Sequence, residues 1–208
     1  MIKERFHTNR PTYSIEVFPP KKDSDVSVIY DALDEFKYLQ PDFISVTYGA
    51  GGNTVENTFA IANYIQNQCG IEALCHLTCA AIPDKLFLDN FLTNLYRNGI
   101  HNLLPLRGDK PVMMSEEEFQ ARYYEHASDL ITDVRKNNDF CVAGACYPEV
   151  HPEAASPEED IENLKIKVDA GVDFLTTQLF YDNEIFYRFM EKVRAAGITV
   201  PVLAGLMP

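Results

Sequence analysis

The chain has 208 residues, of which 46% are hydrophobic and 24% charged, and this composition predicts one globular domain with a sizeable core. Its net charge of −13 argues against nucleic acids and anionic membrane surfaces as partners, because both would repel it. The five cysteines form no framework pattern and the N-terminal MIKERFHTNR contains no apolar leader, so we expect a cytoplasmic protein that spans no membrane.

Strand-like and helical segments alternate along the chain. Seven apolar runs typical of strands begin near residues 12, 42, 72, 101, 139, 173 and 200. Between them, apolar residues recur at helical spacing, most clearly at Ile29, Ala32, Leu33 and Phe36 and at Leu88, Phe91, Leu92 and Leu95. Helix N-termini are predicted at Asn53 with Glu56, Ser115 with Glu118, and Ser156 with Pro157 and Glu159. Helix ends are predicted at Gly99, Gly171 and Gly197.

This alternation predicts a parallel sheet covered by helices, and the near-continuously apolar strands fit burial on both faces. A doubly wound open sheet and a (β/α)8 TIM barrel both fit the pattern. We favour the barrel, because no phosphate-binding glycine motif follows the first strand and the unit repeats evenly. A complete barrel takes about 250 residues. Residues 1–208 are therefore expected to form a single catalytic barrel domain of seven strands and six helices, without the last helix–strand–helix portion.

Polar residues gather where the predicted strands end, which in a barrel is the mouth that carries the active site. These residues are Glu16; Thr47 and Tyr48; His76 and Thr78; Arg107, Gly108 and Asp109; Tyr147 and His151; and Gln178. A barrel with only a structural role has no reason to concentrate such side chains at one mouth. The sequence therefore predicts a binding or catalytic site there.

Three of these features have two interpretations each. Glu16 lies inside an apolar strand, and it is either a carboxylate paired with a lysine or a desolvated acid that donates a proton near neutral pH. The LRGD motif at 106–109 either offers charged groups to a ligand or forms a simple turn. The GAGG motif at 49–52 resembles a phosphate loop without the P-loop lysine, and a flexible connection explains it equally well.

The helix predicted after Ser156 has a polar stripe, because Asp160, Asn163 and Lys167 share one of its faces. Side chains near the N-terminus of a barrel helix lie close to the catalytic mouth. The stripe is therefore either a solvated face or a grip on the ribose and phosphate of a ligand.

No metal site is predicted. Glu149, His151 and Glu153 could supply ligands after the fifth strand, but no CxxC pair and no helical histidine pair anchors them. Small buried thiols explain the cysteines better.

Eight short motifs follow one another in the order SIEVFPP, ISVTYGA, HLTC, LRGD, HASDLI, YPEVHPEA, NLKIKVDAG and TTQLFYD. Together they resemble the methylenetetrahydrofolate reductase family of the bacterial type, from about residue 13 to residue 208. That family is a flavoprotein (β/α)8 barrel that reduces 5,10-methylenetetrahydrofolate to 5-methyltetrahydrofolate through FAD, in one-carbon metabolism and methionine biosynthesis. The resemblance implies an oxidoreductase with FAD as cofactor and a folate as substrate.

The resemblance also implies residue roles. Glu16 matches the general acid that protonates the folate ring nitrogen, Asp109 matches an aspartate beside flavin and pterin, and Gln178 matches a folate contact. The positions that match FAD contacts are Thr47, Tyr48, Ala50, His76, Arg107, Gly108, Asp109, His126, Ala127, Tyr147, His151, Ala154, Asp160, Asn163 and Lys167. On this interpretation the YPEVHPEA loop is a cofactor wall that its prolines hold rigid.

Two departures and several alternatives accompany the resemblance. Family residues beyond the seventh strand are absent, Ile166 lies where relatives can carry a basic residue, and His126 replaces an aromatic position. The electron donor is a reduced nicotinamide (NADH or NADPH) or an electron-transfer protein of the ferredoxin type, and a homo-oligomer or a partner subunit is left open. The alternative functions are a flavin-free pterin-binding methyltransferase and a non-catalytic subunit that binds flavin or folate.

Overall fold

The structure, a computed structural model, describes the chain except residues 9, 21–26, 49–54, 112–113, 138 and 208. The seven strands are β1 (Ser14–Val17), β2 (Phe43–Val46), β3 (Glu72–Thr78), β4 (Asn102–Leu106), β5 (Cys141–Cys146), β6 (Phe174–Thr177) and β7 (Val202–Leu203). The α-helices are α1 (Ser27–Phe36), α2 (Val55–Tyr64), α3 (Lys85–Arg97), α4 (Glu116–Gln120), α5 (Ala127–Arg135), α6 (Pro157–Asp169) and α7 (Asn183–Ala195). Short 3₁₀ or π segments are η1 (Ile2–His7), η2 (Lys37–Leu39), η3 (Ile65–Cys69) and η4 (Cys79–Ala81).

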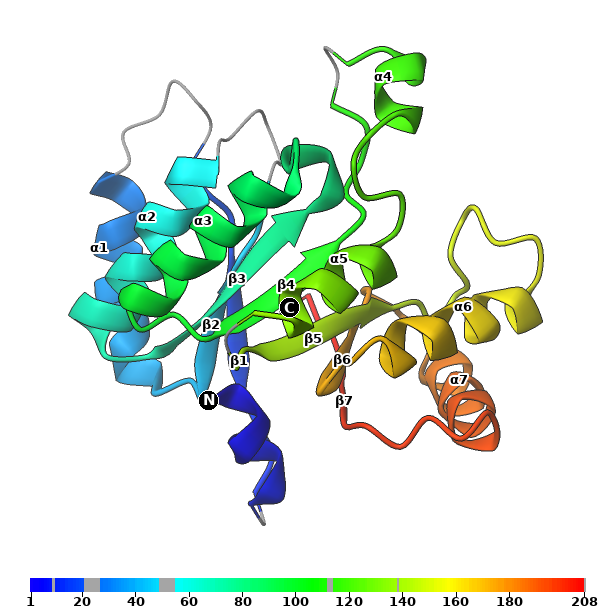
Figure 1. The fold of residues 1–208 in the computed structure, drawn as a ribbon. Coiled ribbons are helices and arrows are strands. Elements are labelled where there is room, and N and C mark those ends of the chain that lie inside the picture. The colour runs from blue at the N-terminus through cyan, green and yellow to red at the C-terminus, as the bar shows by residue number, and fades with distance from the viewer. Residues whose placement is uncertain (9, 21–26, 49–54, 112–113, 138, 208) are drawn as a thin grey trace.

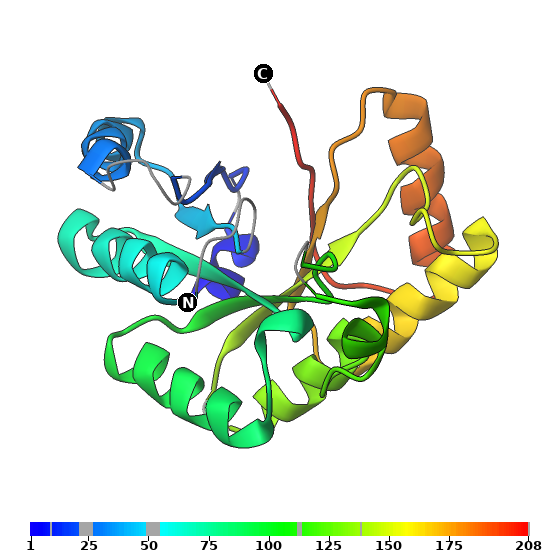
Figure 2. The ribbon, with the colours of Figure 1, turned by 90° about the horizontal axis from the view of Figure 1, so that it is seen from above.

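The strands lie side by side in chain order, every neighbouring pair is parallel, and the sheet curls into an arc with α-helices on its outer side (Figures 1 and 2). β1 and β7 are the two edges, and the described residues contain no pairing between them. The predicted barrel class is confirmed as a half-barrel. Each of the six connections contains a helix, and the β4–β5 connection contains two, because a capping box between Ser115 and Glu118 starts the separate helix α4.

The inner face of the arc is apolar toward the amino ends of its strands and polar toward their carboxyl ends. Phe43 and Leu74 belong to a buried cluster inside the arc, and the residues two and four positions later are polar. Side chains alternate between the faces of a strand. Ser45 and Thr47 therefore follow Phe43 on the inner face, and His76 follows Leu74.

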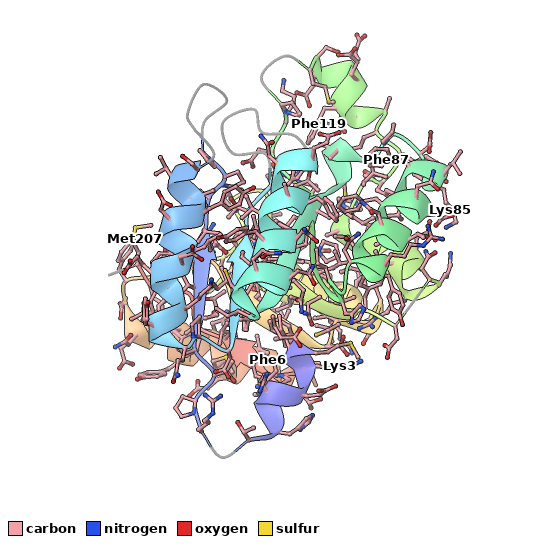
Figure 3. All side chains as sticks on the ribbon, turned by 90° about the vertical axis from the view of Figure 1, so that its left-hand side faces the viewer. Lys3, Phe6, Lys85, Phe87, Phe119 and Met207 are labelled. Atoms are coloured by element: carbon pink, nitrogen blue, oxygen red, sulfur yellow. The ribbon has the colours of Figure 1, made fainter. Side chains whose placement is uncertain are left out.

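The N-terminal segment η1, which the sequence analysis did not predict, closes the amino end of the arc. Ile2 is fully buried in the inner cluster, and its backbone N–H donates to Oδ1 of Asn102 at 2.9 Å. The ring of Phe6 lies 4.9 Å from that of Phe174. Figure 3 shows Phe6 and Lys3 at one end of the molecule and Phe119 of α4 at the other. The inner cluster is thereby covered from below, and the polar carboxyl ends lie on the opposite side.

A second, larger core lies between the sheet and the helices, and several predicted helix boundaries frame it. Ser156 Oγ accepts the backbone N–H of Glu159 at 3.1 Å, as predicted for the start of α6. Gly99, Gly171 and Gly197 have positive φ angles after helices, which confirms the predicted helix ends. The N-terminus predicted at Asn53 lies outside the described residues. Within the described ranges, no helix is both long and apolar enough to cross a membrane.

Candidate active site

Glu16 lies at the carboxyl end of β1 on the inner face, with its side chain about half exposed. It pairs in register with Ser45 on β2, whose hydroxyl donates to Oε2 of Glu16 at 3.0 Å. Burial raises the pKa of the Glu16 carboxyl above its ordinary value, and the hydrogen bond from Ser45 opposes that rise. The resulting group is an acid whose protonated form persists to higher pH than that of an ordinary glutamate. The lysine partner of the alternative interpretation is absent among the described residues, where the basic side chain within 4 Å of Glu16 is His76.

His76 lies on β3 with its side chain 6% exposed, and its Nε2 is 3.6 Å from Oε2 of Glu16. Burial lowers the pKa of His76 to about 4, so the imidazole is neutral at pH 7. Among the described residues, His76 Nε2 and Thr47 Oγ1 are buried without a hydrogen-bond partner. Because buried polar atoms are normally paired, both point to a polar group that a ligand would bring.

The neutral state of His76 makes the fold sensitive to acid. The unfolded chain binds a proton at the ordinary pKa of 6.5, whereas the folded chain does so only near 4. The contribution of His76 to the free energy of unfolding is therefore complete above pH 6.5 and is lost as the pH falls toward 4. We expect the free energy of unfolding to drop by about 2 kcal/mol from this residue between pH 7 and pH 5. In urea titrations, His76→Gln should lack this pH-dependent loss of the free energy of unfolding. His7→Gln, which replaces an exposed histidine, should retain it. Equal pH dependence in wild type and His76→Gln would contradict the assignment.

Gly108 follows β4 with φ +77°, and it lies against Thr78 at the end of β3. A Cβ atom at Gly108 would lie 2.7 Å from the Thr78 Cβ, which is closer than real side chains approach. Thr78 is itself buried. The glycine is required both by its backbone conformation and by this contact, and it fixes the direction in which Arg107 and Asp109 leave the strand.

A cavity of about 400 Å³ lies beside these strand ends, over the carboxyl ends of β4 and β5 and against α5 and α6. That volume is within the range of small-molecule sites, about 300–1,000 Å³. Nine of the fifteen positions predicted to contact a cofactor line it: Arg107, His126, Ala127, Tyr147, His151, Ala154, Asp160, Asn163 and Lys167. These residues come from four separate segments of the chain, and the fold gathers them around one space.

One wall of the cavity is the loop between β5 and α6, which the sequence analysis interpreted as rigid. The Tyr147 and His151 rings meet edge to face with centroids 4.7 Å apart. Asp160 accepts the His151 backbone N–H at 3.2 Å, and His151 Nδ1 accepts the Glu153 backbone N–H at 3.1 Å. Val150 has φ +71°, a strained conformation for a β-branched residue. Hydrogen bonds and ring packing therefore hold the loop, in addition to its prolines.

Two cations face the cavity, and both already have partners. Arg107 forms a two-pronged ion pair with Glu153, and the bond from Arg107 Nη2 to Glu153 Oε1 measures 2.7 Å. The Arg107 guanidinium lowers the pKa of Glu153 below its ordinary range. Lys167 donates from Nζ to the Ala145 carbonyl at 2.8 Å, and burial lowers its pKa. Arg107 and Lys167 are the lining residues that could hold a phosphate.

The other predicted positions that the structure describes lie outside this cavity. Asp109 and Gln178 are exposed, and the Gln178 Oε1 accepts the backbone N–H of Leu179 at 2.9 Å. Tyr48 is half-buried, and burial raises its pKa to about 12, which keeps its hydroxyl protonated. Ala50 and the GAGG motif fall outside the described residues. The described chain holds no cluster of three His, Cys, Asp or Glu side chains placed to bind a metal ion.

Sequence reasoning missed two contacts at the site. Ser45 was not singled out, although the alternation of Phe43, Ser45 and Thr47 places it on the same inner face as Glu16. Glu153 was considered as a metal ligand or as part of a loop that walls a cofactor, and the structure shows it in an ion pair with Arg107 that was not predicted. The two partners are 46 residues apart, so no local pattern joins them.

Comparison with known proteins identifies the family. The family model for methylenetetrahydrofolate reductase matches residues 1–208. This chain belongs to the methylenetetrahydrofolate reductase family. It is 40% identical over 218 residues to a probable methylenetetrahydrofolate reductase (NADH) of Oryza sativa subsp. japonica, covering 100% of this chain and 36% of that protein. It is 39% identical over 196 residues to the 5,10-methylenetetrahydrofolate reductase of Escherichia coli (strain K12), covering 94% of this chain and 64% of that protein.

A solved structure with the same fold belongs to an uncharacterized protein from Clostridium thermocellum that binds two copies of 5-methyl-5,6,7,8-tetrahydrofolic acid. The TM-score is 0.68 at 15% identity, with 98% of this chain and 68% of that one covered. A putative lyase/mutase from Burkholderia cenocepacia has a TM-score of 0.65 at 12% identity, covering 97% of this chain and 80% of that one. The chain spans about a third of its rice relative and 64% of its Escherichia coli relative among methylenetetrahydrofolate reductases.

Proposed function

We propose that this chain is the catalytic barrel of a flavin-dependent methylenetetrahydrofolate reductase, which converts 5,10-methylenetetrahydrofolate to 5-methyltetrahydrofolate with FAD as cofactor. The observation that carries the proposal is the cavity at the carboxyl ends of the strands. It is lined by nine of the positions that the family resemblance assigns to FAD. Family membership supports the reaction, and the arrangement of the cavity supports the cofactor.

The residues present fit a flavin dinucleotide in three respects. Thr47 Oγ1 and His76 Nε2 are buried polar atoms without a partner in the described chain, and a polar ring edge would satisfy them. Arg107 and Lys167 would hold the phosphates, and Asp160 and Asn163 share the helix face beside Lys167 and would hold the ribose. Tyr147 and His151 would form the wall that keeps water from this part of the cofactor.

FAD, when bound, would carry a hydride from the electron donor to the methylene carbon of the folate. The chain itself supplies the proton and the orientation. Glu16 would hold a proton on its carboxyl group and deliver it to the folate ring nitrogen, which opens the five-membered ring to a reactive iminium. Asp109 and Gln178, both exposed at the same mouth, would contact the pterin. The neutral His76 would leave Glu16 without a cation that favours its ionised form.

The proposal also covers the electron donor, the substrate and the location of the protein. A reduced nicotinamide is the proposed electron donor, in line with the designation (NADH) of the rice relative. A folate is the proposed substrate, in line with the binding of 5-methyl-5,6,7,8-tetrahydrofolic acid by the Clostridium thermocellum protein of the same fold. The cytoplasm is the proposed location.

Replacement of Lys167 tests the cavity as the cofactor site. Lys167→Met keeps the length of the side chain but removes the buried ammonium group, so we expect the dissociation constant for FAD to rise about tenfold. Flavin fluorescence quenching measures this without turnover. Lys165→Met is the matched control, because Lys165 is on the same helix, half-exposed, and pairs with Asp169. Unchanged FAD affinity in Lys167→Met, or equal loss in both variants, would place the cofactor elsewhere.

A further inference from the structure

The hydrogen bond between Ser45 and Glu16 is built into the sheet. The two residues are register partners on adjacent parallel strands, so their side chains stand next to each other on the inner face. Ser45 is 5% exposed, and its hydroxyl is 3.0 Å from Oε2 of Glu16. A buried hydroxyl with a single carboxylate neighbour has little freedom to rotate away. The contact is therefore a fixed feature of the site.

Within the described residues, Ser45 is the group that hydrogen-bonds to the Glu16 carboxyl, and it contacts only Oε2. On β3, His76 lies 3.6 Å from Oε2, the same oxygen that Ser45 contacts, and its imidazole is neutral. No other charged or titratable side chain of the described residues pairs with Glu16. Oε1 carries no hydrogen bond from the described chain, and the Glu16 side chain as a whole is half-exposed.

We propose that Ser45 is a positioning residue for the proton transfer: its hydroxyl holds Oε2 of Glu16 as an acceptor, so that Oε1 carries the proton and presents it to the substrate. An oxygen that already accepts a hydrogen bond is the less basic of the two, which leaves the proton on the other. Ser45 does not touch the reacting atoms, and it acts only through Glu16. The catalytic part of this inference rests on the proposed function, whereas the hydrogen bond itself does not.

The first test needs no cofactor. In protein labelled with ¹³C at glutamate carboxyl groups, NMR titration follows Glu16, whose signal is assigned by its loss in Glu16→Gln. Ser45→Ala removes a donor that favours the ionised carboxylate, so the pKa of Glu16 should rise by about one pH unit. Ser45→Thr retains the hydroxyl and should restore the original value. Ser14→Ala, on β1 opposite Phe43, controls for general disturbance of the strand pair. An unchanged Glu16 titration in Ser45→Ala would overturn the proposal.

The second test separates positioning from a merely structural role. With FAD bound, transfer from reduced flavin to the folate should slow about tenfold in Ser45→Ala, and its alkaline limit should move to higher pH. Flavin reduction by NADH should be unchanged, and Ser45→Thr should recover the folate step. Should Ser45→Ala fold poorly, Ser45→Cys provides a side chain of similar size with a weak donor and the same expected shift. If Glu16→Gln stops the folate step while Ser45→Ala behaves as wild type, the inference about Ser45 fails alone. If Glu16→Gln leaves the folate step intact, both the inference about Ser45 and the role proposed for Glu16 fail.

Discussion

Glu16→Gln is expected to lower the rate of folate reduction by a factor of about 10²–10⁴, the usual contribution of a general acid. The amide has nearly the same shape as the carboxyl group but cannot supply a proton. Glu16 is the acid at this mouth whose pKa burial raises, which favours its protonated form. Reduction of bound flavin by NADH requires no proton from Glu16, so that step should proceed at the wild-type rate. Stopped-flow absorbance of the flavin separates the two half-reactions.

Glu149→Gln is the matched control for this result. Glu149 is an exposed carboxylate on the loop after β5, at the same end of the barrel, and it does not line the cavity. Its replacement removes one negative charge from the same mouth and should leave both half-reactions unchanged. Equal slowing in Glu16→Gln and Glu149→Gln would show that net charge, rather than proton donation, produces the effect. Loss of flavin reduction in Glu16→Gln would likewise argue against the assigned role.

Gly108→Ala is expected to destabilise the fold by about 2–4 kcal/mol, which combines a left-handed backbone with overpacking. The new methyl group would lie 2.7 Å from Cβ and 2.9 Å from Cγ2 of Thr78. Thr78 is buried at the end of β3, so its Cβ cannot move without shifting the strand. The same shift would displace Arg107 and Asp109, so both the affinity for FAD and the free energy of unfolding should fall. Urea unfolding and flavin fluorescence measure the two effects.

Gly70→Ala isolates the steric part of this prediction. Gly70 has φ +68°, close to that of Gly108, but an added Cβ would meet nothing within 4 Å. Its replacement should therefore show only the backbone strain, about 1 kcal/mol, and should leave FAD binding unchanged. If both alanine variants lose the same free energy of unfolding, the contact with Thr78 is not what requires glycine at position 108.

The sequence predicts the strands and most helices of this fold, because each leaves a local pattern. The seven apolar runs all became strands, and the capping residues Ser115 and Ser156 start helices where expected. Segment η1 was missed because its contribution to the core depends on the distant partners Asn102 and Phe174, which no local periodicity reveals.

The site was only partly accessible from the sequence, for two physical reasons. The resemblance names residues, but the grouping of Arg107, Tyr147 and Lys167 around one cavity comes from the packing of α6 against β5 and α5. Hydrogen bonds between strands depend on the register of the strands, and the sequence of a single strand does not reveal that register. The bond from Ser45 to Glu16 was therefore found only in the structure.

The transfer of hydride from reduced flavin to folate is the step that tests the proposed function most directly. The protein is loaded with FAD and reduced under anaerobic conditions, 5,10-methylenetetrahydrofolate is added, and the visible absorbance of the flavin is followed. We expect the absorbance of oxidised flavin to return as 5-methyltetrahydrofolate forms in equal amount. A protein that binds the folate but takes up no FAD would instead support a flavin-free methyltransferase. A flavin that stays reduced in the presence of bound folate would contradict the proposed reaction.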